Sequence, residues 1–179
     1  EEKLVPDIEA YRVVEAEQRV GRSRFDFLLA HEETEEPLLL EVKSCTLFGV
    51  DGRVAMFPDA VTARGARHVR ELTEMADEGQ KTAVLIMVHW PEAQLFSPDF
   101  HTDLEFARAF LESRDKVNTI AVSVRWTSNL ELDGELQRCD IPWERIEQEA
   151  HDRGSYLVLL ENDRDRTLEV GALGELDFP

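Results

Sequence analysis

The sequence predicts a mixed α/β fold, a β-sheet flanked by helices, and three observations support it. Strand-like apolar runs come first, and helical and strand-like segments alternate after them. The runs over 38–47 and 82–90 are almost continuously apolar, as in strands buried on both faces of a sheet. A chain of 179 residues can hold one domain with a full core and a short appended piece.

The N-terminal part of the chain is expected to form strands. Residues 11–19 alternate between polar and apolar side chains like a half-buried strand. The dipeptide Val20-Gly21 turns the chain into a second strand over 24–30. The acidic loop HEETEEP then leads to the third strand over 38–47.

A helix is expected from about Ala60 to Glu78, where Gly79 ends it. Its polar face is predicted to carry Arg64, His68 and Glu71, and its apolar stripe to consist of Val69, Leu72, Met75 and Ala76. The buried strand over 82–90 follows.

A second helix begins at a capping box, with Thr102 as N-cap and Glu105 three residues later, and extends to about Ser113. Its inward side chains are predicted to be Leu104, Ala107 and Leu111. The next strand covers 118–126.

The C-terminal part differs from the rest of the chain in its pattern of polar and apolar residues. Residues 129–136 could form a short hairpin, and a helix is expected from Pro142 to Gly154. Residues 155–179 resemble a β-hairpin of a further unit.

The formal net charge of −18 bears on partners and compartment. Only four of the twenty basic residues are lysine against 38 acidic ones, as in halophilic proteins whose charge repulsion is screened by a salt-loaded cytoplasm. Residues 43–70 carry five basic and two acidic side chains, either by chance or as a positive surface beside a site. Cys45 and Cys139 lack zinc-site spacing, and no apolar run approaches a membrane span, so we expect a cytoplasmic protein.

Three charged residues on two neighbouring strands form the candidate site. Asp26 lies on the second strand, and the side chains of Glu41 and Lys43 leave the same face of the third. Two carboxylates can hold Mg²⁺ or Mn²⁺, and a lysine can position water or offset phosphate charge, as metal-dependent phosphodiesterases require. Two structural alternatives stay open, an ion pair between Glu41 and Lys43 and a pairing of Asp26 with Arg24.

Further side chains near this triplet could bind a phosphate backbone. Arg22 and Arg24 could grip a phosphate or simply balance nearby acids. Asp59 or Thr62 can cap the following helix, and a helix N-terminus attracts anions. The side chains that follow on this helix would track nucleic acid or form a solvated face: Arg64, Arg67 and His68.

Four motifs together resemble one protein family. SRFDFLL, LLLEVKSCTL, FPDAVTARGARHVREL and DEGQKTAVLIMVHW occur in the order found in the sugar fermentation stimulation protein (SfsA) family, and the resemblance covers about residues 5–138. It implies a restriction-endonuclease-like fold of the PD-(D/E)XK type over 1–138. The family's N-terminal OB-like domain is expected to be absent. Residues 139–179 would form a linker helix and a partial hairpin that resembles the start of an archaeal GIY-YIG-like domain.

The resemblance also implies residue roles. Asp26 and Glu41 would bind the metal ion together with the backbone carbonyl of Val42, and Lys43 would assist catalysis. Asp26 follows Phe25 instead of the motif's proline, a common kind of drift in this superfamily. The side chains that would line the site or the helix mouth are Arg22, Arg24, Ser44, Asp59, Thr62, Arg64 and His68.

The sequence therefore predicts a DNA-binding protein that acts as a Mg²⁺- or Mn²⁺-dependent nuclease on DNA or RNA. The alternative is a non-catalytic DNA-binding regulator of sugar metabolism on the same scaffold, and a purely structural domain is a third reading. Nucleic acid is the expected partner, a homodimer is a further candidate, and no membrane partner is expected.

Overall fold

The computed structural model describes residues 5–50 and 52–154. The chain divides into two compact units, residues 1–142 and 143–179. Helix α3 (Trp143–Gly154) belongs to the second unit and agrees with the helix predicted there. The predicted hairpin over 155–179, with its GIY-YIG-like resemblance, lies outside the described residues. In the part of the chain that is described, no helix is long and apolar enough to cross a membrane.

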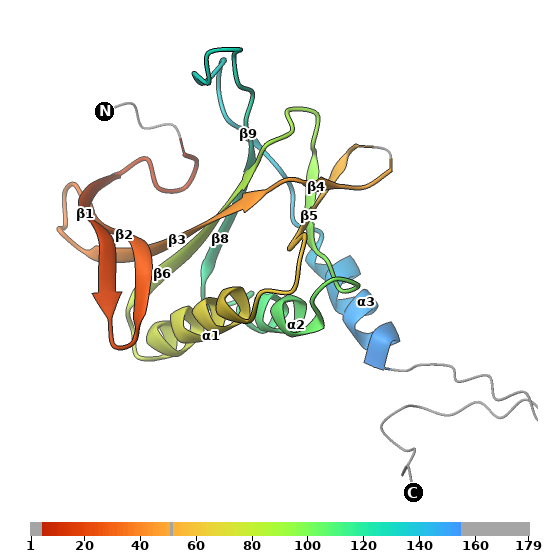
Figure 1. The fold of residues 1–179 in the computed structure, drawn as a ribbon. Coiled ribbons are helices and arrows are strands. Elements are labelled where there is room, and N and C mark those ends of the chain that lie inside the picture. The colour runs from red at the N-terminus through yellow and green to blue at the C-terminus, as the bar shows by residue number, and fades with distance from the viewer. Residues whose placement is uncertain (1–4, 51, 155–179) are drawn as a thin grey trace, which may run out of the picture. The chain divides into compact units, whose positions relative to one another are not determined.

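The first unit is built on a six-stranded mixed sheet with the strand order β1-β2-β3-β6-β8-β9 (Figure 1). Strands β3, β6 and β8 run parallel to one another, and the remaining neighbours are antiparallel. The six strands are Tyr11–Val20, Ser23–His31, Pro37–Cys45, Lys81–Val88, Asn118–Ser123 and Gln137–Arg138. The predicted mixed α/β architecture is confirmed.

A second, three-stranded sheet was not expected from the sequence. It consists of β4 (Leu47–Phe48), β5 (Val54–Phe57) and β7 (Leu95–Pro98). These strands have two, four and four residues, which is too short for a periodic pattern to develop. The strand predicted over 38–47 is accordingly divided, because β3 ends at Cys45 and β4 begins at Leu47.

Helices α1 (Ala63–Asp77) and α2 (Leu104–Glu112) lie along one face of the large sheet (Figure 1). The N-cap of α2 is Asp103, whose carboxylate accepts the Phe106 amide at 2.9 Å, so the predicted Thr102 cap is wrong. Thr102 instead donates to Asp99 at 2.6 Å. The fully buried side chains of α2 are Phe106, Ala107, Ala109 and Phe110, whereas the predicted Leu104 and Leu111 are half-buried.

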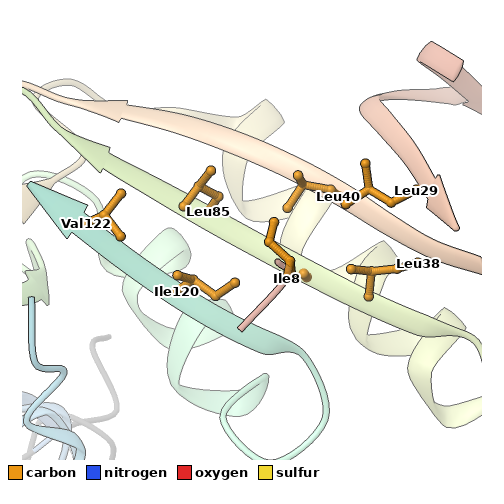
Figure 2. Close-up of a cluster of buried hydrophobic side chains, with 8 residues drawn as sticks. Ile8, Leu29, Leu38, Leu40, Leu85, Ile120 and Val122 are labelled. Carbon is orange, nitrogen blue, oxygen red and sulfur yellow. The ribbon is translucent and has the colours of Figure 1, made fainter. Parts of the chain in front are cut away.

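The opposite face of the sheet carries an aliphatic cluster that the segment before β1 partly covers. Figure 2 shows the side chain of Ile8 among side chains from four strands. The other buried members are Leu29, Leu38, Leu40, Ala83, Leu85, Ile120 and Val122. A groove of about 980 Å³ opens over this face.

Strand β1 is more exposed than its alternating sequence predicts. Its register against β2 shifts between Val13 and Glu15, which interrupts the two-residue alternation. Val13 and Val14 are both about half exposed as a result. The strand lies at the edge of the sheet, so β2 is its one partner within the part of the chain that the structure describes.

Candidate metal and nucleic-acid site

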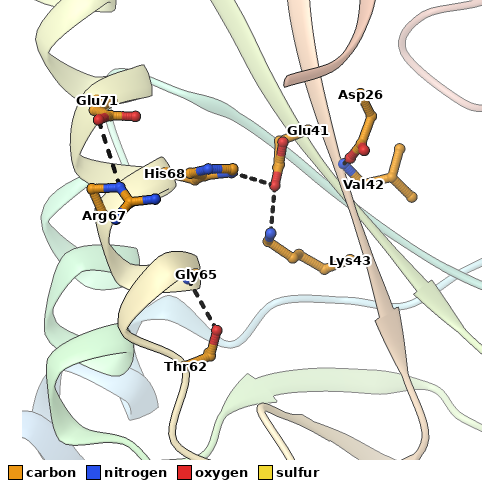
Figure 3. A network of polar contacts seen from close by, with 9 residues as sticks. All are labelled: Asp26, Glu41, Val42, Lys43, Thr62, Gly65, Arg67, His68 and Glu71. Carbon is orange, nitrogen blue, oxygen red and sulfur yellow. Dashed lines mark hydrogen bonds and ion pairs between the residues drawn. The ribbon is translucent and has the colours of Figure 1, made fainter. Parts of the chain in front are cut away.

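The Glu41 carboxylate is the centre of a buried polar cluster between β3 and α1. Its Oε1 atom accepts from Lys43 Nζ at 2.5 Å and lies 2.6 Å from His68 Nδ1. The side chains of Glu41 and His68 are 4% and 1% exposed. Figure 3 shows Glu41 and Lys43 pointing from the strand toward His68 on α1. The two side chains of the E-x-K pair thus share one face, as strand alternation predicts.

His68 corrects the predicted polar face of α1. The sequence pattern placed it with Arg64 on a solvated face, but its imidazole is buried and lies 5.2 Å, centre to centre, from the Phe25 ring. A side chain this deeply buried offers no surface to a nucleic acid. Its contact with Glu41 makes it a positioning residue for that carboxylate. Of the predicted apolar stripe, Val69 and Leu72 are fully buried, and Met75 and Ala76 are half-buried.

The second carboxylate oxygen of Glu41 lacks a hydrogen-bond donor among the described residues. Oε2 is buried and has no hydrogen-bond partner among the described residues. A buried carboxylate oxygen without a partner is costly, because it has lost water and gained nothing in return. A divalent cation is the ligand that would satisfy such an oxygen best. The donor chemistry at this position therefore fits a metal ion.

The Asp26 carboxylate contacts the backbone of β3 and not the side chain of Lys43. The ladder between β2 and β3 ends at the pair Phe27–Leu40, next to Asp26. At that point the Asp26 Oδ2 atom accepts the Val42 amide hydrogen at 2.7 Å. The half-buried Asp26 side chain lines the groove with Val42 and Ser44, whose side chains leave the opposite face of β3 from Glu41 and Lys43. Figure 3 shows Asp26 beside Val42, on the other side of the strand from Glu41, Lys43 and His68, so the structure does not bring the two predicted metal-binding carboxylates together.

Of the two ion pairs considered for these charges, Glu41 with Lys43 and Asp26 with Arg24, the structure contains the first. Arg24 lies 3.4 Å from Glu17, so it balances an acid of β1 and is not the partner of Asp26. Glu41 and Lys43 do form an ion pair. No cluster of three or more His, Cys, Asp and Glu side chains suited to a metal occurs within residues 5–50 and 52–154. A metal ion bound by both Asp26 and Glu41 would require the Asp26 carboxylate to leave the Val42 amide and turn toward Glu41, and binding by these two residues and the Val42 carbonyl stays a prediction.

The N-terminus of α1 is capped by Thr62, as predicted. Its hydroxyl accepts the Gly65 amide at 3.0 Å, and its own amide donates to Asp103 at 2.7 Å. Asp59 stands outside the cap and receives a hydrogen bond from Thr46 at 3.4 Å. The link from Asp103 to Thr62 joins two helix starts 41 residues apart, and nothing in the local sequence signals it.

The basic side chains predicted to bind nucleic acid are exposed. Arg22, Arg24, Arg64 and Arg67 all lie on the surface, and Arg67 is 3.8 Å from Glu71. Ser44 is exposed at the rim of the groove. These side chains are accessible to a phosphate backbone, and their binding of nucleic acid stays a prediction.

Comparisons with known proteins agree on one family. Residues 1–129 match the family model described as "Sugar fermentation stimulation protein RE domain". A sugar fermentation stimulation protein homolog of Methanothermobacter thermautotrophicus is 39% identical over 145 residues, which cover 80% of this chain and 59% of the relative. The homolog of Pyrococcus furiosus is 32% identical over 137 residues, which cover 76% of this chain and 56% of the relative.

A solved structure supports the same fold. The structure of Pyrococcus furiosus SfsA in complex with Ca²⁺ is similar with a TM-score of 0.65 and 28% sequence identity. The similarity covers 76% of this chain and 57% of that chain. This chain thus spans roughly half the length of the curated relatives that it matches.

Proposed function

The chain belongs to the sugar fermentation stimulation protein (SfsA) family, and from that premise we propose that this domain is a divalent-metal-dependent nuclease acting on DNA or RNA. The observation that carries the proposal is the Glu41 carboxylate. One of its oxygens is bound by Lys43 and His68, and the other is buried without a partner among the described residues. Buried carboxylates normally satisfy both oxygens. Glu71 of α1 also has a buried Oε2 atom without a partner, but its ion pair is with the exposed Arg67, whereas Glu41 is held by the buried His68.

Asp26 and Glu41 would hold Mg²⁺ or Mn²⁺ together with the Val42 carbonyl, once the Asp26 carboxylate has left the Val42 amide and turned toward Glu41. A cation bound there supplies positive charge for the leaving oxygen and makes its bound water more acidic. The Pyrococcus furiosus relative was solved with Ca²⁺, which prefers oxygen ligands as Mg²⁺ does. That relative supports an oxygen-lined cation site in this chain.

Lys43 has the properties of a group that handles phosphate charge. Its ammonium is held by Glu41 and only 13% of its side chain is exposed. An ammonium group has three hydrogens, so two remain to donate to a phosphate oxygen or to orient water. His68 holds the Glu41 carboxylate in position, and that carboxylate in turn holds the Lys43 ammonium. The exposed side chains that would contact the phosphate backbone of the nucleic acid are Arg22, Arg64 and Arg67.

The test is a cleavage screen of single- and double-stranded DNA and RNA at high salt, with Mg²⁺, Mn²⁺ or EDTA. The wild-type protein is expected to cleave only with a metal ion, and Glu41→Gln to lower the rate about 100-fold or more, because it removes a ligand charge. Glu36→Gln is the matched control, since Glu36 is an exposed partner of Lys81. Lys43→Ala and Lys81→Ala form a second pair. Cleavage by Glu41→Gln at the wild-type rate would refute the nuclease.

A non-catalytic DNA-binding regulator is the second candidate, and one observation favours it. Each charge of the site already has a protein partner, since Asp26 is bound to the Val42 amide and Glu41 to Lys43 and His68. The two functions differ in metal dependence. A regulator is expected to bind DNA without a metal ion. In that case Mn²⁺ does not raise the Tm of the wild type above that of Glu41→Gln.

A further inference from the structure

We propose that the ring pair of Phe48 and Trp90 stacks on an unpaired base, so that single-stranded nucleic acid is the preferred substrate class. The inference rests on the proposed nuclease function and adds the strandedness of its substrate. It concerns a surface that lies outside the cluster around Glu41.

Trp90 lies where the parallel strands β3 and β6 end. The His89 amide donates to the Cys45 carbonyl at 2.9 Å, and this bond continues the pairing of the two strands by one residue. Phe48 arrives at the same place from β4, which begins two residues after β3 ends. Open α/β sheets bind their ligands at the carboxyl ends of parallel strands. The ring pair therefore occupies the edge where a substrate is expected.

The ring pair lies at the same end of the sheet as Lys43. Lys43 is paired with Ile86, four residues before Trp90, and β6 ends between them at Val88. Four extended residues span about 13 Å, which is an upper limit because the chain bends at His89. Four nucleotide steps of a single strand cover about the same length. A short single strand is therefore long enough to reach from Lys43 to the rings.

The indole of Trp90 is fixed in place and still accessible. Its ring centre lies 5.6 Å from that of Phe48. Gly52, at φ +69°, lets the backbone approach the indole, because a Cβ atom there would lie 3.3 Å from its Nε1. The residue nevertheless stays 41% exposed. A ring positioned in advance loses little conformational freedom on binding, and stacking on it tolerates any base.

One exposed basic side chain lies close to the ring pair in the chain. Arg53 follows Gly52, whose backbone approaches the indole of Trp90. Glu92 lies near Trp90 in sequence, but its carboxylate is paired with Arg125 at 3.2 Å. A basic side chain next to an accessible aromatic ring favours a ligand with phosphates and unpaired bases over an apolar peptide.

The test measures binding of the whole chain in EDTA, which prevents cleavage. The probes are a labelled twelve-nucleotide oligothymidylate, an abasic strand of equal length and a twelve-base-pair duplex. Trp90→Ala and Trp90→Leu are expected to raise the Kd for oligothymidylate about tenfold or more and to leave the abasic strand unchanged. Trp90→Phe keeps a ring and is expected to retain most of the affinity.

Trp126→Ala is the matched control. Trp126 is 40% exposed and also stacks on a neighbour, His89, but it follows β8 rather than β6. Stacking by Trp90 is refuted if Trp90→Leu binds oligothymidylate with the Kd of the wild type. It is also refuted if the Kd for the abasic strand rises by the same factor as the Kd for oligothymidylate. It is also refuted if Trp126→Ala shows the same loss. A wild type that binds no oligothymidylate in EDTA also refutes stacking by Trp90. The nuclease proposal is judged separately, because cleavage with a metal ion that Glu41→Gln abolishes would support it in each of these cases.

Discussion

The Glu41 side chain is held from two directions that are far apart in the sequence. Lys43 is two residues away on the same strand, and His68 is 27 residues away on α1. The sequence predicts the first neighbour, because residues i and i+2 of a strand share a face. It cannot predict the second, because the rotation of α1 about its axis depends on packing against the sheet.

Removal of the His68 imidazole is expected to destabilise the fold. His68→Ala leaves Glu41 with one partner fewer and a cavity beside Phe25, so the free energy of unfolding in urea should fall by about 2–4 kcal/mol. The control is His151→Ala, whose side chain is 78% exposed, with an expected change within about 0.5 kcal/mol. Equal effects of the two variants would mean that the buried contact contributes nothing.

The two cysteines give a pH-dependent prediction. Burial raises the pKa of the Cys45 thiol to about 12 and that of Cys139 to about 11. In the unfolded chain a thiol ionises near pH 8.5, so ionisation stabilises only the unfolded state above that pH. This contribution to stability is complete below about pH 8.5 and is lost as the pH rises toward 11–12.

The measurement is the urea unfolding free energy at several values from pH 7 to pH 10.5. The wild type should lose stability more steeply over this range than the double variant Cys45→Ala/Cys139→Ala, which has no thiols to ionise. Lysine and tyrosine titrate in both proteins and cancel in the comparison. Parallel curves would show that the thiols ionise equally well in the folded state.

At the scale of elements, local rules predicted the regular parts and failed at their ends. The Thr62 cap of α1 follows from a threonine placed before the first helical turn. The start of α2 was shifted by one residue, because Asp103 and Thr102 are both good caps and only the fold engages Asp103 with Thr62. The short strands β4, β5 and β7 form their sheet with one another across segments that are distant in the sequence, so no segment predicts them alone.

The cap of α1 is expected to be worth about 1 kcal/mol. Thr62→Ala removes the acceptor of the Gly65 amide and should lower the unfolding free energy by that amount, measured in urea. Thr62→Ser keeps the hydroxyl and should stay close to the wild type. If serine and alanine are equally destabilising, the threonine methyl group, which lies against Gly65, is the important part.

At the scale of the whole molecule, the net charge of −18 makes stability depend on salt. Like charges repel in the compact state, and added ions screen this repulsion. Raising KCl from 0.1 M to 2 M should therefore increase the unfolding free energy by at least about 1 kcal/mol, which corresponds to a rise in Tm of roughly 2–4 °C for a chain of this size. An unchanged Tm would contradict a halophilic surface.

The sequence by itself determined the mixed sheet, the helix positions, and the shared face of Glu41 and Lys43. These features depend on periodicity and on neighbours in the chain, so a local pattern contains them. The tertiary structure alone decided that His68 faces inward, that Asp26 binds the Val42 amide, and that Phe48 meets Trp90. Each of these contacts joins distant segments, and their geometry depends on how the elements pack.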